Sequence, residues 1–525
     1  MMQSKTGMSS IATAVKLLVA AAAIGAMGGA SAQVADSDTT HVIVAFKHGK
    51  HADMHKEIGR RHGRVKHDLA EINSVAIEIT RKELRELRKN KDVESVEEDA
   101  IRYPFATTSP STGTPYVLGQ LVPYGIKMVQ ADQLSDINAG NRKVCIIDSG
   151  IDRAHEDLSG NSMTGEYDSG TGWWYTDENH HGTHVAGTIA AINNSGLGVV
   201  GVNPNRKLKL HIVKVFNAAG WAYSSSLAAA ANKCGAAGAN VISMSLGGPT
   251  SNNTEKRAFD ALAAKGVLSI AASGNDANTA ISYPAGYASV MSVGAVDENK
   301  AWASFSQYNS KVEIVGPGVA VLSSVPTNSG TSPALKVGTT TYAPGAMEGS
   351  PVKSASAVLA DFGLGDKTTT TVSGKVCLIS RGTVDFATKV MNCQNSGGVG
   401  AVVYNNVAGA FGGTMGTTVS TIPSVTATDV DGASLKTKLG QSATVAVTPT
   451  SYAYFDGTSM ATPHVSAVAA LVWSYFPTCT GPQIRTSLGK SAQDLGPVGR
   501  DVKFGFGLVQ AKAAYDRIRT MGCGV

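Results

Sequence analysis

The sequence predicts an α/β protein whose main body is a three-layer parallel sheet with helices on both faces. From about residue 119 onward, short apolar strands alternate with alanine-rich helices, as where "LKLHIVKVF" is followed by "SSLAAAANKCGAAG". This alternation is typical of parallel strands joined by crossover helices. A hydrophobic content of 43%, with 16% charged residues and 58 glycines, indicates a well-packed, turn-rich protein. A length of 525 residues leaves room for further domains.

The first 32 residues have the form of a signal peptide. Lys5 and Lys16 precede the apolar run "LLVAAAAIGAMGGASA", which ends in the small-residue pattern Ala30-Ser31-Ala32. No later segment reaches the ~18 uninterrupted apolar residues of a membrane span. We therefore expect a secreted, extracellular protein with no membrane span. The net charge is only +5, and the sequence lacks the clustered basic and aromatic residues of a nucleic-acid-binding protein. We therefore expect no nucleic-acid partner.

Residues 33–110 form a separate leading unit with a core at 41–103. "HVIVAF" and "SVAIEI" alternate like strands, and "KELRELRKN" has helical periodicity, so the unit is a small α+β domain. It contains six of the twelve histidines. The Ser/Thr/Pro/Gly stretch that follows is typical of an exposed linker, and we expect a proteolytic cut within about 104–119.

A second unit interrupts the main body at 327–451, which leaves 111–326 and 452–525 as its two halves. The insertion has its own strands, "GKVCLISRG" and "VGAVVYNN", and a helix between them. Its length is that of a domain, so it is predicted to fold by itself.

Six cysteines in an exported chain predict disulfide bonds. Fifteen pairings are possible from sequence alone. The nearest-neighbour hypothesis joins Cys377 to Cys393, Cys479 to Cys523, and Cys145 to Cys234.

Three polar residues stand at strand ends or helix starts of the main body. Asp148 ends the strand "VCIID", His181 begins "HGTHVAGTIAA", and Ser459 opens the apolar helix after "DGT". Each alone is explained by an ordinary cap or turn. Together they supply a hydroxyl nucleophile, an imidazole base and a carboxylate to orient it, which acyl transfer requires. The amide of Asn275 and the backbone N–H of Ser459 could bind the oxyanion.

Five segments, "VCIIDSGID", "HGTHVAGTIAA", "SMSLGG", "AASGN" and "DGTSMATPHV", resemble the subtilisin family of serine endopeptidases in type and order. The resemblance implies a subtilisin-like fold and hydrolysis of protein or peptide substrates through an acyl-enzyme. It assigns Asp148 to orient His181, His181 as general base and then acid, Ser459 as nucleophile, and Asn275 as oxyanion ligand. His184, one turn on, becomes a structural residue.

The resemblance also implies how substrate binds. An extended peptide adds as a strand to the segment "SLGG", and the side chain before the cut enters a pocket beside it. The expected substrate-binding residues are Ser245, Leu246, Gly247, Gly248, Ala271, Ala272, Ser273 and Gly274. Asp276 is a candidate for favouring a basic side chain at the rim, and Tyr283-Pro284 matches a family cis peptide.

A structural Ca²⁺ ion is a further implication. Gln120, Asp157 and Asn194 match the side-chain ligands of the family's strong site, and carbonyls of Ile192, Leu197 and Val199 are expected to complete an oxygen shell. The loop "INNSGLGVV" is one residue longer than the family pattern. An ordinary Asn/Gly turn beside an Asp cap is the alternative.

The leading unit resembles the inhibitor-type propeptides of the family, so the protein is expected to be a self-processed zymogen held by its own propeptide and to act as a monomer. Its histidines could make release of the propeptide pH-dependent. The insertion resembles a protease-associated domain, with either a spacer or a substrate-positioning role. Two alternative functions are an esterase-like serine hydrolase, whose G-x-S-x-G motif is missing around Ser459, and an inactive peptide-binding module.

Overall fold

The structure is a computed structural model that describes residues 39–108, 120–194 and 196–525. The predicted signal peptide and residues 109–119 of the predicted cleavage window lie outside the described residues. Within the described ranges, no helix combines the length and hydropathy that crossing a membrane requires.

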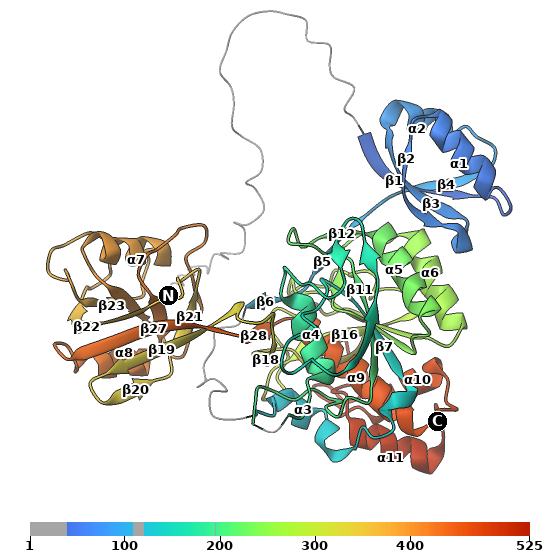
Figure 1. The fold of residues 1–525 in the computed structure, drawn as a ribbon. Coiled ribbons are helices and arrows are strands. Elements are labelled where there is room, and N and C mark those ends of the chain that lie inside the picture. Colours follow the sequence, from blue (N-terminus) through green and yellow to red (C-terminus); the bar gives the residue numbers. More distant parts are fainter. Residues whose placement is uncertain (1–38, 109–119, 195) are drawn as a thin grey trace, which may run out of the picture.

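A seven-stranded sheet forms the centre of the molecule (Figure 1). All its neighbouring strands run parallel, in the order β17-β16-β15-β13-β7-β11-β8. The strands are β7 (Lys143–Asp148), β8 (Ser162–Gly165), β11 (Lys209–Lys214), β13 (Val241–Met244), β15 (Leu268–Ala272), β16 (Val290–Val296) and β17 (Val312–Pro317). The predicted parallel α/β fold is confirmed.

Helices cover both faces of this sheet. One face packs against α4 (His181–Ala190), α9 (Thr458–Tyr475), α10 (Gly481–Ser491) and α11 (Ala511–Met521), and the other against α5 (Ser224–Ala236) and α6 (Asn253–Ala264). Two hydrophobic cores result, a first core beneath α4, α9, α10 and α11 and a second core beneath α5 and α6. In strand β7, Val144 and Ile146 belong to the first core, and Cys145 and Ile147 belong to the second. Successive side chains of a strand point to opposite faces, so an apolar run such as β7 is buried on both.

The leading unit has its own core beside the main body (Figure 1). Its antiparallel sheet has the order β2-β3-β1-β4. Its elements are β1 (Thr39–Phe46), α1 (His51–Arg60), β2 (Arg64–Leu69), β3 (Ser74–Thr80), α2 (Arg81–Leu87) and β4 (Val93–Glu98). Leu69 packs with Ala228 of α5 and Ala258 of α6, so the unit is docked on these two helices.

The insertion forms a nine-stranded sheet with the order β20-β19-β27-β22-β23-β24-β26-β21-β25 and the helices α7 (Phe386–Asn395) and α8 (Asp429–Lys436). Its strands are β19 (Gly330–Val337), β20 (Thr340–Tyr342), β21 (Gly345–Glu348), β22 (Ser354–Asp361), β23 (Val376–Ser380), β24 (Gly400–Tyr404), β25 (Gly413–Thr414), β26 (Ser424–Ala427) and β27 (Ser442–Thr450). Both of its ends leave the main body through one antiparallel pair, β18 (Val321–Ser324) and β28 (Tyr452–Asp456). Because its two ends are adjacent, the insertion projects to one side without interrupting the central sheet (Figure 1).

Three disulfides join Cys145 to Cys234, Cys377 to Cys393, and Cys479 to Cys523. The nearest-neighbour hypothesis is thus confirmed. The Cys145–Cys234 disulfide joins β7 to α5 within the core that lies beneath α5 and α6. The Cys377–Cys393 disulfide lies within the insertion.

Candidate active site

Asp148 and His181 meet at the carboxyl end of the central sheet. Asp148 is the last residue of β7, fully buried, and its Oδ1 lies 2.7 Å from Nδ1 of His181, the first residue of α4. The same oxygen accepts the backbone N–H of Ser149 at 2.8 Å. Side chains at the ends of parallel strands converge at one edge of the sheet, and this edge commonly holds the working residues of α/β proteins.

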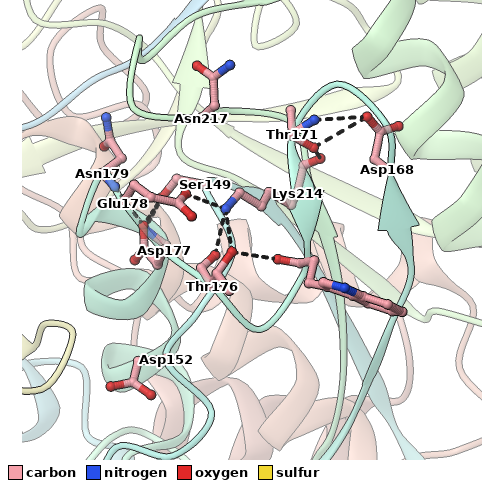
Figure 2. Close-up of polar contacts among 12 residues, drawn as sticks. Ser149, Asp152, Asp168, Thr171, Thr176, Asp177, Glu178, Asn179, Lys214 and Asn217 are labelled. Carbon is pink, nitrogen blue, oxygen red and sulfur yellow. Dashed lines mark hydrogen bonds and ion pairs between the residues drawn. The ribbon is translucent and has the colours of Figure 1, made fainter.

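The loop before α4 fixes the position of His181, a feature that the sequence motifs do not indicate. The Asp177 carboxylate accepts a hydrogen bond from Ser149 Oγ at 2.8 Å (Figure 2). It also accepts the backbone N–H groups of His180 and Thr183, each at 2.9 Å. Burial raises the pKa of Asp177. Lys214 of β11 donates to the carbonyl of Thr176 at 2.8 Å and holds the same loop from the other side (Figure 2).

Ser459 lies in the first turn of α9, completely buried. Its Oγ donates to the carbonyl of Ser245 at 2.7 Å and accepts the N–H of Phe105 at 2.9 Å. The Nε2 atom of His181 is buried and has no hydrogen-bond partner among the described residues. The expected imidazole–hydroxyl hydrogen bond is therefore not formed in this arrangement, because the hydroxyl donates its proton to the carbonyl of Ser245.

Asn275 and Ser459 share one hydrogen-bond acceptor, the carbonyl oxygen of Phe105. Asn275 Nδ2 donates to it at 2.9 Å, and the backbone N–H of Ser459 at 3.3 Å. The Oδ1 of Asn275 accepts the N–H and the hydroxyl of Thr458, at 3.0 and 2.8 Å. This second pair of bonds orients the amide so that its NH₂ faces the carbonyl. Two fixed donors on one carbonyl oxygen are the arrangement that stabilises an oxyanion.

Residues 101–108 cross the site as an extended segment (Figure 1). Strand β5 (Ile101–Pro104) lies between β14 (Leu246–Gly247) and β12 (Ala222–Tyr223), and both pairings are antiparallel. The N–H of Phe105 also donates to the carbonyl of Ser245 at 3.3 Å. Beyond Phe105, β6 (Thr107–Thr108) pairs with β28. The chain thus binds its own main-chain segment by strand addition.

The predicted substrate-binding residues divide into two groups. Ser245, Leu246, Gly247 and Gly248 contact the bound segment directly. A Cβ on Gly247 would lie 2.6 Å from the ring of Phe105, so only glycine leaves room for that ring. Ala271, Ala272 and Ser273 are buried, and the N–H of Gly274 donates to the Thr458 hydroxyl at 3.2 Å.

The expected calcium ligands come together around the Gln120 side chain, with one exception. Gln120 Nε2 is 2.8 Å from the Ile192 carbonyl, 3.0 Å from Asn194 Oδ1 and 3.4 Å from the Val199 carbonyl. Asp157 joins this group through Asn194 Nδ2 at 2.7 Å and the Val199 N–H at 2.7 Å. Burial raises the pKa of Asp157.

Leu197 is the exception, because its carbonyl is not among the oxygens that the Gln120 amide contacts in the described part of the loop, and its side chain is 53% exposed. The prediction that its carbonyl is a calcium ligand stays a prediction.

Two smaller expectations concern the surroundings of the site. The peptide bond between Tyr283 and Pro284 is cis, as expected. His184 is buried, stacks on Phe455 and bonds through Nε2 to the carbonyls of Val321 and Ala453. Burial lowers its pKa to about 3, which keeps it neutral, in agreement with a structural role.

Comparison with known proteins identifies the family. The model of the subtilase family matches residues 140–352 and 392–507, more than half of the chain. The chain belongs to the subtilase family. A PA domain model also matches residues 338–435, within the insertion. The subtilase is a serine endopeptidase that hydrolyses peptide bonds of proteins.

Several relatives resemble this subtilase. Subtilisin NAT of Bacillus subtilis subsp. natto is 35% identical over 323 residues, which cover 56% of this chain and 76% of that protein. Subtilisin DY of Bacillus licheniformis is 43% identical over 220 residues, which cover 41% of this chain and 78% of that protein. The crystal structure of the psychrophilic subtilisin-like protease Apa1 from Pseudoalteromonas sp. AS-11 superposes with a TM-score of 0.61 at 43% identity, covering 77% of this chain and all of that one.

Proposed function

We propose that Asp148, His181 and Ser459 are the catalytic triad of this endopeptidase, with Asn275 as oxyanion ligand, and that its first substrate is its own Phe105–Ala106 bond. The observation that carries the proposal is the Phe105 carbonyl oxygen, which accepts hydrogen bonds from both Asn275 Nδ2 and the Ser459 N–H. A carbonyl held by two such donors is polarised for attack by the neighbouring hydroxyl.

The reaction begins when the Ser459 hydroxyl turns from Ser245 toward Nε2 of His181, which has no hydrogen-bond partner in the described part of the chain. His181 takes the hydroxyl proton, and Oγ bonds to the carbonyl carbon of Phe105. Asn275 and the Ser459 N–H hold the resulting oxyanion.

The intermediate then collapses. The bond from Phe105 to the nitrogen of Ala106 breaks, and His181 returns its proton to that nitrogen. Water then attacks the Phe105 ester, with His181 again acting first as base and then as acid, and Ser459 is released. Asp148 stabilises the imidazolium of His181 in both acylation and deacylation.

We propose that the leading unit remains bound as an inhibitory propeptide after this cut. Two of its carboxylates cap helices of the main body: Asp99 accepts the N–H of Ser225 at 2.9 Å at the start of α5, and Glu97 accepts the N–H of Thr254 at 3.0 Å in the first turn of α6. Anionic caps at helix N-termini are favourable. These bonds and β5 are independent of the Phe105–Ala106 bond, so they survive its cleavage.

The oxygens around Gln120 support a bound Ca²⁺ ion. Those of Ile192, Asn194 and Val199 converge on one atom of the Gln120 amide, and the carboxylate of Asp157 adjoins them. An oxygen-only cluster with one carboxylate suits Ca²⁺. Turning the amide end for end would present its oxygen to the ion, because the two ends are nearly equivalent in shape. The ion would fix the loop after α4.

We propose that the enzyme is secreted and acts as a monomer. Three disulfides favour an oxidising compartment. The residues of the proposed site all come from one chain.

A fluorophosphonate probe tests the proposed nucleophile. We expect the matured wild-type enzyme to be labelled and to digest casein, and Ser459→Ala to do neither while keeping the same circular dichroism spectrum. Labelling of folded Ser459→Ala would show that another residue is the nucleophile. Hydrolysis of p-nitrophenyl esters without digestion of casein would favour the esterase alternative.

A further inference from the structure

Arg102 of the bound segment has a completely buried guanidinium in a main-body pocket. Its Nε donates to Glu255 Oε1 at 3.0 Å and its Nη2 to Glu255 Oε2 at 2.7 Å. Nη2 also donates to the Thr250 carbonyl at 3.0 Å. Arg102 is 0% exposed, and the two parallel bonds match the planar fork of a guanidinium to a carboxylate.

Glu255 belongs to the main body, and two main-body residues hold it besides Arg102 of the leading unit. It lies in the first turn of α6, is 0% exposed, and its backbone N–H donates to the Asn252 side chain at 2.9 Å. The Tyr287 hydroxyl donates to Glu255 Oε2 at 2.6 Å. When the leading unit departs, these contacts remain and the carboxylate loses its guanidinium.

The register of the bound segment shows how far the Arg102 pocket lies from the proposed cleavage at Phe105–Ala106. Phe105 offers its carbonyl to the two oxyanion donors, so Arg102 is the fourth residue before the scissile bond. Its strand β5 binds by pairing with β14 and β12, a mode open to any extended peptide. A substrate in this register brings its own fourth residue to Glu255.

We propose that Glu255 forms a specificity subsite for a guanidinium on the fourth residue before the cleaved bond. The departing segment takes the guanidinium away from this carboxylate, so a substrate arginine regains a bidentate, charge-assisted interaction that alanine cannot supply. A substrate lysine supplies the positive charge but lacks the planar pair of N–H donors that bonds both carboxylate oxygens of Glu255. The inference rests on the proposed function, because the position of Phe105 at the oxyanion donors defines the register.

Chromogenic peptides and the matured enzyme test the subsite. The peptides are Arg-Tyr-Pro-Phe, Lys-Tyr-Pro-Phe and Ala-Tyr-Pro-Phe p-nitroanilides, of which the first copies residues 102–105. We expect kcat/KM to follow the order arginine, lysine, alanine, with arginine about 10- to 100-fold above alanine. In Glu255→Gln, the ratio between the arginine and alanine peptides should fall to about twofold or less, since an amide offers the guanidinium no charge. Asp260→Asn, a surface acid on the same helix, is the matched control and should keep the wild-type ratio.

The outcomes separate this inference from the proposed function. Equal kcat/KM for the arginine and alanine peptides, with both cleaved and Ser459 labelled, would overturn the subsite and leave the endopeptidase mechanism intact. Failure to cleave any peptide, together with absence of labelling, would overturn the proposed mechanism and the subsite with it. If Glu255→Gln does not mature, the comparison of the three peptides on the wild-type enzyme still decides the question.

Discussion

The carbonyl oxygen of Phe105 lies 2.9 Å from Nδ2 of Asn275. These residues are far apart in the sequence and belong to units with separate hydrophobic cores. The contact therefore shows that the segment after the leading unit is docked in the site of the main body. It also sets the register of the whole segment from Arg102 to Thr108 on the main body.

Replacing Asn275 should reduce turnover with little effect on substrate affinity. Asn275→Ala removes the side-chain donor to the developing oxyanion, so kcat should fall about 10²–10³-fold, the loss observed when a subtilisin loses its oxyanion asparagine. Steady-state kinetics on a peptide p-nitroanilide measures this. A raised KM with unchanged kcat would assign Asn275 to ground-state binding instead.

A methyl group on Gly247 should exclude aromatic side chains from the pocket beside β14. The new Cβ would lie 2.6 Å from the ring position that Phe105 occupies. In Gly247→Ala, kcat/KM for a phenylalanine before the cut should fall about tenfold or more relative to an alanine peptide. The ratio of the two substrates within each enzyme corrects for loss of folded protein. An unchanged ratio would mean that the ring of a substrate binds elsewhere.

Release of the leading unit should accelerate on acidification, because His67 lies at its contact with α5. Its Nε2 is 3.0 Å from Ser226 Oγ. Burial lowers the pKa of His67, a shift that Asp99 and Asp168 oppose and Lys233 and Lys66 reinforce. The docked state thus favours the neutral ring, and docking weakens as the pH falls below the free value of about 6.5, by at most about tenfold per pH unit. Asp99 acts in the opposite direction nearer pH 4, since burial raises its pKa.

Size-exclusion chromatography of the processed, fluorophosphonate-blocked complex at about pH 7.5 and about pH 5.5 measures this release. We expect more free leading unit at the lower pH and a smaller difference in His67→Gln. His48→Gln, which changes an exposed turn histidine of the same unit, is the control. Equal retention at both pH values would exclude a role for His67.

Removal of calcium should destabilise the mature enzyme. An ion that binds only the folded state raises its stability by RT ln(1 + [Ca²⁺]/Kd), so a chelator should lower Tm by several degrees. Asp157→Asn should reduce this difference, because it removes the carboxylate of the cluster. Differential scanning fluorimetry with and without EDTA measures both. A chelator-insensitive Tm in the wild type would favour the ordinary turn over an ion site.

The fold and the positions of Asp148, His181, Asn275 and Ser459 could be predicted because each lies in a short local pattern at a strand end or helix start. The hydrogen bonds of the Ser459 hydroxyl could not, since its partners Ser245 and Phe105 both lie more than two hundred residues away in the sequence.

The pairing of Arg102 with Glu255 was equally inaccessible, as strand addition has no local signal and a lone acid in a helix usually faces solvent. The Leu197 carbonyl stays a prediction, because family spacing does not transfer directly to a loop that is one residue longer.

The most direct test of the proposed mechanism is the N-terminus of the protein after it matures by itself, determined by intact mass and N-terminal sequencing. We expect a main-body chain that begins at Ala106 and a leading unit that ends at Phe105, with neither formed by Ser459→Ala. An intact Phe105–Ala106 bond in the active enzyme, or the same cleavage in purified Ser459→Ala, would contradict it.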